Sequence, residues 1–170
     1  MNPDVYTVAL PYPESRPCRQ DVRMARRLFP MYTGCAGELA AISGYLYAAL
    51  RTEESTPELG RIIDDLARTE MHHFRILGRL IRDLGADPFI RARIDGSQLP
   101  LEPPEGCCDG RTRAHNTRLL LEQSLHSEQT ADDNSRFVST HTDDEAVRAQ
   151  LHRIMQDEEK HVQLFQSMLK

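Results

Sequence analysis

Two stretches, Glu70-Met71-His72-His73 and Glu158-Glu159-Lys160-His161, decide how this chain is expected to fold. Each places a glutamate three residues before a histidine, and residues i and i+3 share one face of a helix. A carboxylate and an imidazole can therefore point to the same place from one helical turn. Two such helices facing each other, with one inward glutamate from each of two further helices, supply the ligands of a di-metal carboxylate site in a four-helix bundle.

Apolar residues at helical spacing predict the first two helices of this bundle. A helical pattern begins near Gln20, and Pro30 either ends a short lead-in helix or kinks one long helix that runs to about Arg51. The second helix is expected to begin at Thr56-Pro57, with Thr as N-cap and Pro at the first helical position, and to end near Leu84.

The same periodicity predicts two more helices in the second half of the chain. The third is expected from Asn116 to about Thr140, and a capping box, Thr142-Asp143-Asp144-Glu145, opens the fourth. Residues 88–115 are rich in proline and glycine and lie between the second and third helices. A connection of this length is needed if the third helix runs parallel to the second, because the chain must then return along the whole bundle.

The remaining glutamates are found by their distance from the turns. Glu38 and Glu70 lie equally far from the turn predicted at residues 51–56, and Glu128 and Glu158 lie equally far from the turn at residues 141–144. Antiparallel helices bring residues equidistant from their turn to the same level. The predicted metal ligands, all at mid-bundle, are Glu38, Glu70, His73, Glu128, Glu158 and His161.

Metal ions would explain why four carboxylates and two imidazoles lie on apolar helix faces. A buried carboxylate without a partner costs several kcal/mol or takes up a proton. Two divalent ions would offset four negative charges and would bind the imidazoles in their neutral form. The mixed oxygen and nitrogen ligands favour two iron or two manganese ions per chain as the cofactor.

Neighbouring residues offer alternatives to this ligand set. Glu122 competes with Glu128, but it faces away from the apolar stripe of the third helix. Tyr45 lies two turns after Glu38 on the same face, where it either packs in the core or hydrogen-bonds to a ligand. His72 and Glu159 lie off the stripes and are expected to be solvated.

Composition limits the kinds of binding partner and the cellular location that are expected for this protein. The 170 residues carry a net charge of −5 with acidic and basic residues interspersed, so no nucleic-acid partner is expected. No apolar run is long enough to cross a membrane, and residues 1–15 do not resemble a signal peptide, so a cytoplasmic location is expected. The four cysteines form no C-x-x-C motif and are expected to be free thiols.

Proline spacing suggests how the chain is divided. Residues 1–19 contain four prolines and are expected to form an extended N-terminal arm. Residues 20–170 are expected to form one bundle domain, with 88–115 as its crossover loop. Whether the arm lies along the bundle or reaches a neighbouring molecule stays open at this point.

Taken together, these motifs resemble the ferritin-like superfamily, in particular its rubrerythrin and manganese-catalase branch and the small single-domain bacterial relatives of that branch. The resemblance rests on residues 37–42, 45–47, 70–73, 76–78, 127–128 and 157–161. It implies an all-α, ferritin-like four-helix bundle with a long crossover between the second and third helices.

The resemblance also implies roles for the six residues and a class of reaction. Glu38 and Glu128 would be terminal ligands, Glu70 and Glu158 would bridge the two metals, and one histidine would cap each ion. An oxidoreductase that acts on hydrogen peroxide or dioxygen is the implied function. Alternatives are a metal-binding or storage protein, which needs an oligomeric cage, and a structural protein such as one of a spore coat.

Two departures from rubrerythrins affect the expected reaction. Ala131 stands where they carry a further glutamate one turn after the third-helix ligand, and the chain ends at Lys170 without a cysteine-rich tail. Peroxidase turnover would then need a separate electron-donor protein, whereas a catalase needs none. Pairing of bundles through their outer faces makes a homodimer or larger homo-oligomer the expected assembly.

Overall fold

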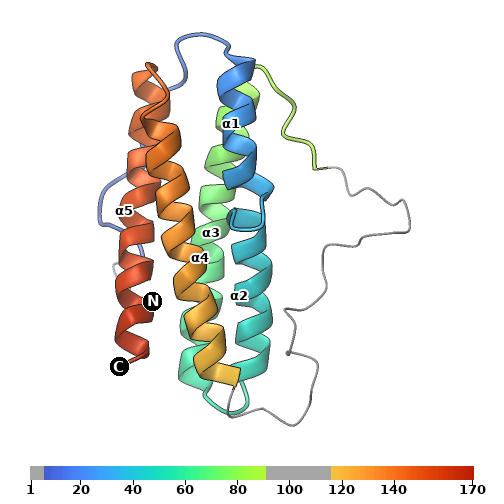
Figure 1. The fold of residues 1–170 in the computed structure, drawn as a ribbon, viewed down its shortest axis with the longest axis vertical. Coiled ribbons are helices and arrows are strands. Elements are labelled where there is room, and N and C mark those ends of the chain that lie inside the picture. Colours follow the sequence, from blue (N-terminus) through green and yellow to red (C-terminus); the bar gives the residue numbers. More distant parts are fainter. Residues whose placement is uncertain (1–5, 91–115) are drawn as a thin grey trace, which may run out of the picture.

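The computed structural model describes residues 6–90 and 116–170, and the helices in these ranges form an elongated bundle (Figure 1). α1 (Val22–Thr33) and α2 (Glu38–Thr52) follow one another along one column, and the other three columns are α3 (Pro57–Asp83), α4 (Asn116–Ser139) and α5 (Glu145–Met168). α2 packs most extensively on α3, and α4 on α5. The described part of the chain contains no strand, so the predicted all-α bundle is confirmed.

Helix direction explains the need for a long connection. α3 and α4 run in the same direction in Figure 1, while each runs antiparallel to its hairpin partner. α3 has 27 residues, so the chain has to return over about 40 Å before α4 begins. Residues 91–115, which make up most of the predicted crossover, lie outside the described residues.

The first column is broken at two glycines rather than at Pro30, where the sequence predicted an end or a kink. Pro30 lies inside α1, which continues to Thr33. A Cβ atom at Gly34 would lie 2.3 Å from the carbonyl oxygen of Pro30, and one at Gly37 would lie 2.5 Å from that of Met31. Only glycine allows this close approach, and the break makes Glu38 the first residue of α2.

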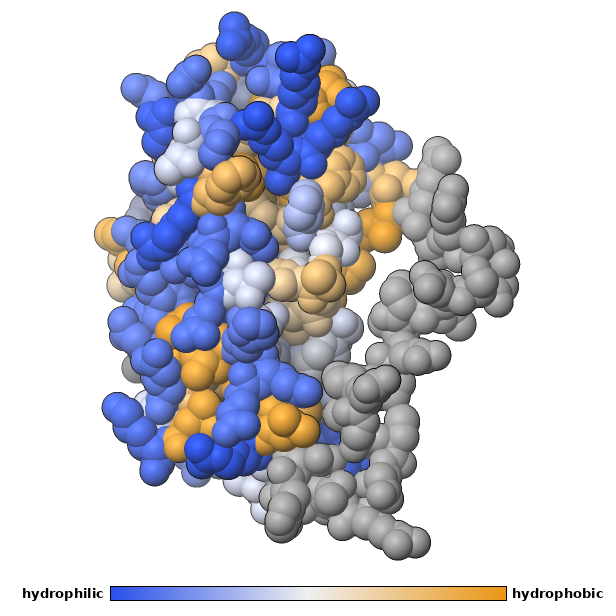
Figure 2. Space-filling view, in the orientation of Figure 1, coloured by the Kyte–Doolittle hydropathy of each residue, from blue (hydrophilic) through white to orange (hydrophobic). Residues whose placement is uncertain are grey.

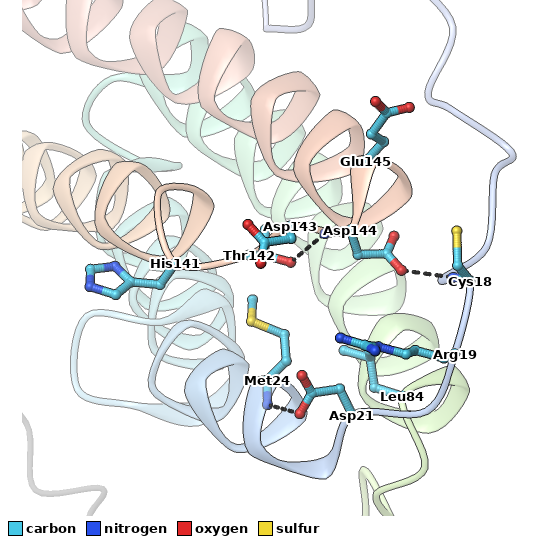
Figure 3. Close-up of a pocket in the computed structure, with 10 residues that line it drawn as sticks. All are labelled: Cys18, Arg19, Asp21, Met24, Leu84, His141, Thr142, Asp143, Asp144 and Glu145. Carbon is cyan, nitrogen blue, oxygen red and sulfur yellow. Dashed lines mark hydrogen bonds between the residues drawn. The ribbon is translucent and has the colours of Figure 1, made fainter.

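Aspartates cap α1 and α5, which corrects the predicted capping box. The side chain of Asp21 accepts a hydrogen bond from the Met24 N–H (Figure 3). The side chain of Asp144 accepts from the Ala146 and Val147 N–H groups. The box had placed the N-cap at Thr142, but the Thr142 hydroxyl oxygen instead accepts from the Asp144 N–H at 3.2 Å. Aspartate is at least as good an N-cap as threonine, and Asp144 is the N-cap of α5.

Two apolar clusters fill the bundle above and below its middle. One joins α1, the second half of α3 and the first half of α5, and includes Leu28, Leu77 and Leu151. The other joins α2, the first half of α3 and the end of α5, and includes Tyr45, Leu66 and Phe165. The level between them holds buried polar side chains. None of the described helices combines the length and the apolar character needed to cross a bilayer.

Candidate metal centre

Six acidic and histidine side chains meet at the polar level between the two apolar clusters. α2 supplies Glu38, α3 supplies Glu70 and His73, α4 supplies Glu128, and α5 supplies Glu158 and His161. None exposes more than 5% of its surface, and both histidines are completely buried. The structure therefore brings together all six residues that the sequence selected, one set from each column of the bundle.

The ligand atoms of these residues form two overlapping groups. Glu38, Glu70, His73 and Glu158 make one group, and Glu70, Glu128, Glu158 and His161 make the other, with the potential ligand atoms of each group within 4.8 Å of one another. Nδ1 of His73 lies 2.9 Å from Glu70 Oε2 and 3.1 Å from Glu158 Oε1. Nδ1 of His161 lies 2.9 Å from Glu70 Oε1. Glu70 and Glu158 belong to both groups.

Unpaired buried atoms in the cluster fit a pair of metal ions. Glu70 Oε1, Glu158 Oε1 and His161 Nδ1 are buried without a hydrogen bond. His161 Nδ1 and Glu70 Oε1 are nevertheless 2.9 Å apart, so they are close but not aligned as donor and acceptor. Ligands about 2.1 Å from one ion lie about 3 Å apart when they occupy adjacent positions. Atoms that converge without bonding one another are the arrangement that a shared ion requires.

The pKa values of these side chains indicate how the cluster is protonated when no metal is bound. Burial alone would lower the pKa of His73 and His161, but the surrounding carboxylates, Glu70 first among them, raise it well above the ordinary 6.5. Burial and then the charges of neighbouring glutamates raise the pKa of Glu38 and Glu128 well above 4.5. In the metal-free protein these shifts favour the protonated form of all four side chains.

The two shared glutamates behave in the opposite way. Burial and the charge of Glu158 would raise the pKa of Glu70, but the two imidazoles outweigh them and lower it. Burial would likewise raise the pKa of Glu158, but the neighbouring Glu128 and the two nearby imidazoles outweigh it and place that pKa well below 4.5. These opposite shifts indicate that the carboxylates and imidazoles of the cluster share protons when no ion is bound. Two divalent ions would offset the charges of four ionised carboxylates.

The outer nitrogen of each histidine is also held. Nε2 of His73 lies 3.2 Å from Asp157 Oδ2 and 3.2 Å from the Tyr12 hydroxyl oxygen. Nε2 of His161 lies 2.8 Å from the backbone carbonyl oxygen of Tyr6, to which it donates. These contacts leave Nδ1 of each ring to face the glutamates. Metal-binding histidines typically donate their other ring N–H to a carboxylate or a carbonyl in this way.

The described part of the N-terminal arm, residues 6–19, lies along α5 in the direction opposite to that helix. Lys160 Nζ donates to the Thr7 carbonyl at 2.7 Å, and Arg153 donates to the carbonyls of Val8 and Leu10 at 2.7 and 3.0 Å. Farther along, the Cys18 N–H donates to Asp144 Oδ2 at 2.7 Å (Figure 3). The structure thus answers the question that the sequence left open, because the arm packs on its own bundle.

Tyr45 contacts the six-residue polar cluster with its hydroxyl group, which donates to Glu128 Oε1. Its ring belongs to the apolar cluster that includes Leu66 and Phe165. Its ring therefore packs in the core, and its hydroxyl group contacts one of the predicted ligands. The hydroxyl satisfies one oxygen of Glu128 and leaves Oε2, which lies 3.4 Å from His161 Nδ1, to face the cluster.

The competing residues lie outside the cluster. The side chain of Glu122 is 48% exposed and pairs with Arg118. Glu159 is exposed and pairs with Arg136, and the exposed His72 contacts the ring of Tyr12. A pocket of about 490 Å³ near the Asp144 cap, lined by Cys18, His141 and others, contains no residue of the cluster (Figure 3).

Sequence reasoning missed the groups that surround the cluster on its histidine side. Asp157 is completely buried next to Glu158. Arg153 is 95% buried, and its guanidinium group forms an ion pair with Asp157 at 2.6 Å. Asp157 is one turn after Arg153 on α5, a spacing that could have signalled the pair. Tyr12 and the Tyr6 carbonyl could not have been found this way, because no periodicity relates the arm to the helices.

Comparisons with known proteins agree with this architecture. A family model described as rubrerythrin matches residues 31–169. A manganese catalase from Anabaena, KatB, superposes with a TM-score of 0.66 at 17% identity, over 94% of this chain and 80% of the catalase. Bacterioferritin from Rhodobacter capsulatus, described with a metal-free dinuclear site and a haem iron, gives a TM-score of 0.69 at 20% identity, over 89% of this chain and 86% of that one. A comparison with curated proteins gave no match. At these identities the two structures show the ferritin-like fold.

Proposed function

Because the chain belongs to the rubrerythrin family, whose model covers most of its length, we propose that its buried cluster holds two iron or two manganese ions and acts on hydrogen peroxide or dioxygen. Glu38, Glu70, His73 and Glu158 would hold one ion, and Glu70, Glu128, Glu158 and His161 the other. The bound ions would supply the one-electron steps that no side chain in the cluster can supply.

One observation carries this proposal: Glu70 and Glu158 belong to both groups of ligand atoms. A single ion needs no shared carboxylates, whereas two neighbouring ions are commonly bridged by them. The raised pKa values of Glu38, Glu128 and both histidines support the same conclusion, since divalent ions can take the place of protons at a buried site.

The protein's own groups would have three tasks in this chemistry. The apolar clusters on either side keep bulk water away from the centre. Burial and neighbouring charges raise the pKa of Glu38 and Glu128 in the metal-free protein, so these two carboxylates would take up protons whenever the ions leave. The Tyr45 hydroxyl group fixes Glu128 by donating to its Oε1.

Metal-uptake and peroxide assays on matched variants test the proposal. Wild-type protein should bind two Fe²⁺ or Mn²⁺ ions and accelerate the loss of hydrogen peroxide, either alone or with an added reductant. Glu70→Gln and Glu158→Gln should each lose most bound metal, whereas Glu122→Gln, on the exposed face of α4, should bind like wild type. Metal-loaded protein that leaves peroxide and dioxygen unchanged would contradict the proposed activity.

A storage function is the second candidate, and the likeness to bacterioferritin favours it. In that case the centre would oxidise Fe²⁺ for deposition inside an assembled cage. Sedimentation of the metal-loaded protein separates the two functions. A large closed oligomer that retains many more than two iron ions per chain would favour storage, and a dimer or another small homo-oligomer would favour turnover. Added reductant tells whether the activity needs a separate electron donor.

A further inference from the structure

We infer that the N-terminal arm is part of the metal centre: Tyr12 and the backbone carbonyl of Tyr6 position the two histidines, and Tyr12 makes the binding of the ion on the His73 side depend on the arm. This inference rests on the proposed metal site, and it assigns to residues 6–12 a task that neither the helices nor the family match identifies. Tyr12 is a positioning residue here, because it acts on the ion through His73.

The contacts of Tyr12 converge on the outer edge of His73. Its hydroxyl group donates to Asp157 Oδ2 and lies 3.2 Å from His73 Nε2, which itself lies 3.2 Å from the same Asp157 oxygen. The Val8 N–H donates to the other oxygen, Asp157 Oδ1, at 2.6 Å. The arm therefore fixes both oxygens of the carboxylate that orients this imidazole.

Arg153 ties these groups to α5. Its guanidinium group pairs with Asp157 Oδ1 at 2.6 Å, donates to two arm carbonyls, and stacks over the Tyr12 ring at 4.2 Å. The ring of Tyr12 also packs against the ring of His72, with 4.5 Å between the two ring centroids. These interactions come from α3 and α5, so Tyr12 can reach His73 only while the arm lies in its place along both helices.

The two histidines are held differently, which makes the inference testable at one ion. His73 faces a carboxylate and a tyrosine hydroxyl, whereas His161 donates to the neutral Tyr6 carbonyl. A charged acceptor makes an imidazole a stronger metal ligand than a neutral one does, and loss of such outer contacts typically costs 10- to 100-fold in metal affinity. Removing the Tyr12 hydroxyl should therefore weaken the ion beside His73 and leave the ion beside His161.

Tyr12→Phe in the full-length protein tests this directly, with Tyr32→Phe as the matched control. Tyr32 is a buried tyrosine of the apolar cluster that includes Leu28 and Leu77, and its ring stacks on Phe74. Anaerobic titration with Mn²⁺, followed by the electron paramagnetic resonance of the free ion, counts the ions and gives the affinity of each. The expected result is an affinity reduced at least tenfold for one of two ions in Tyr12→Phe, with both ions unchanged in Tyr32→Phe.

Hydrogen exchange provides a second readout that needs no substitution. If the arm strengthens metal binding, then metal binding must stabilise the arm by the same free energy. The Val8 amide, which donates to Asp157, should exchange more slowly when Mn²⁺ is bound. The Cys18 amide, which donates to Asp144 at the start of α5, is the internal control and should change little.

The outcomes separate this inference from the proposed site. Two Mn²⁺ ions bound equally well by wild type and Tyr12→Phe, with unchanged exchange at Val8, would overturn the role of the arm while the metal site stands. Equal weakening of both ions would also overturn it, because that result describes a general loss of stability. Failure of wild type and Tyr32→Phe to bind Mn²⁺ or Fe²⁺ would overturn the metal site, and the inference with it.

Discussion

At the scale of single residues, metal binding to the cluster should displace protons. The raised pKa values of Glu38, Glu128 and both histidines favour their protonated forms in the metal-free protein. Binding of two divalent ions near pH 7 should therefore release protons from these side chains. Calorimetric titration in two buffers with different enthalpies of ionisation measures this number. Release of no protons would mean that the ions bind elsewhere.

The same raised pKa values set the pH dependence of stability. A histidine whose pKa is higher in the folded protein than the ordinary 6.5 contributes stability that is complete below pH 6.5 and is lost as the pH rises through the folded value. The melting temperature of the metal-free protein should thus fall as the pH rises above 6.5. Metal-loaded protein, in which the imidazoles are already neutral, should lose much less over the same range.

Tyr45 gives a prediction on the opposite side of the cluster from the arm. Tyr45→Phe removes the hydroxyl group that donates to Glu128 Oε1 and leaves this buried oxygen without that partner. We expect two ions still to bind, with the affinity for the ion near Glu128 reduced about tenfold. Mn²⁺ titration beside the Tyr32→Phe control measures this effect. An unchanged affinity would mean that Tyr45 only packs in the core.

At the scale of helices, the break between α1 and α2 positions Glu38. Gly37→Ala would place a Cβ atom 2.5 Å from the Met31 carbonyl oxygen, so the break has to shift, at a cost of about 1–3 kcal/mol in the free energy of unfolding. Metal affinity should fall with it, because Glu38 directly follows this glycine. Chemical denaturation and metal titration measure the two effects.

Gly44→Ala is the matched control for that substitution. Gly44 lies inside α2 with nothing within 4 Å of the position of an added Cβ atom. Alanine should therefore stabilise the protein by about 0.5–1 kcal/mol through its higher helix propensity, with metal affinity unchanged. Equal effects of the two substitutions would contradict the role assigned to the break.

The helices also show which elements a sequence can predict. Long amphipathic segments such as α3 and α5 were predicted correctly, because an apolar stripe has to be buried whatever the rest of the chain does. The ends of the helices were harder to predict. The sequence predicts the end or kink of the first helix at Pro30, whereas the close backbone approach that requires Gly34 and Gly37 depends on tertiary structure. Thr142 and Asp144 both have side chains suited to an N-cap. The conformation of the turn places the Asp144 carboxylate, and not the Thr142 hydroxyl group, at the first N–H groups of α5.

At the scale of the whole molecule, symmetry between the hairpins made the cluster predictable. In each antiparallel pair the two glutamates lie equally far from the turn, which places them at one level. Only the positions of the turns are needed to predict this. The arm offered no such rule. Its contacts with Asp157 and Arg153 depend on the path of an irregular segment, which follows from hydrogen bonds to backbone carbonyls and not from side-chain periodicity.

Metal binding at mid-bundle should stabilise the whole fold, because each ion joins residues from three helices. Ligands that bind the folded state alone raise stability by about 2.7 kcal/mol at a hundredfold excess over the dissociation constant. We expect the melting temperature to rise by several degrees on adding Mn²⁺ to wild type, but not to Glu158→Gln. An equal rise in both proteins would indicate binding at surface carboxylates.

Metal content decides whether one centre for two ions is formed by Glu38, Glu70, His73, Glu128, Glu158 and His161. Purified protein should be analysed by plasma mass spectrometry as isolated and after anaerobic incubation with Fe²⁺ or Mn²⁺. We expect two iron or manganese ions per chain in wild type and a large loss in Glu70→Gln. No uptake of either metal by folded wild-type protein would contradict the proposed centre and would leave the six residues as a buried polar cluster.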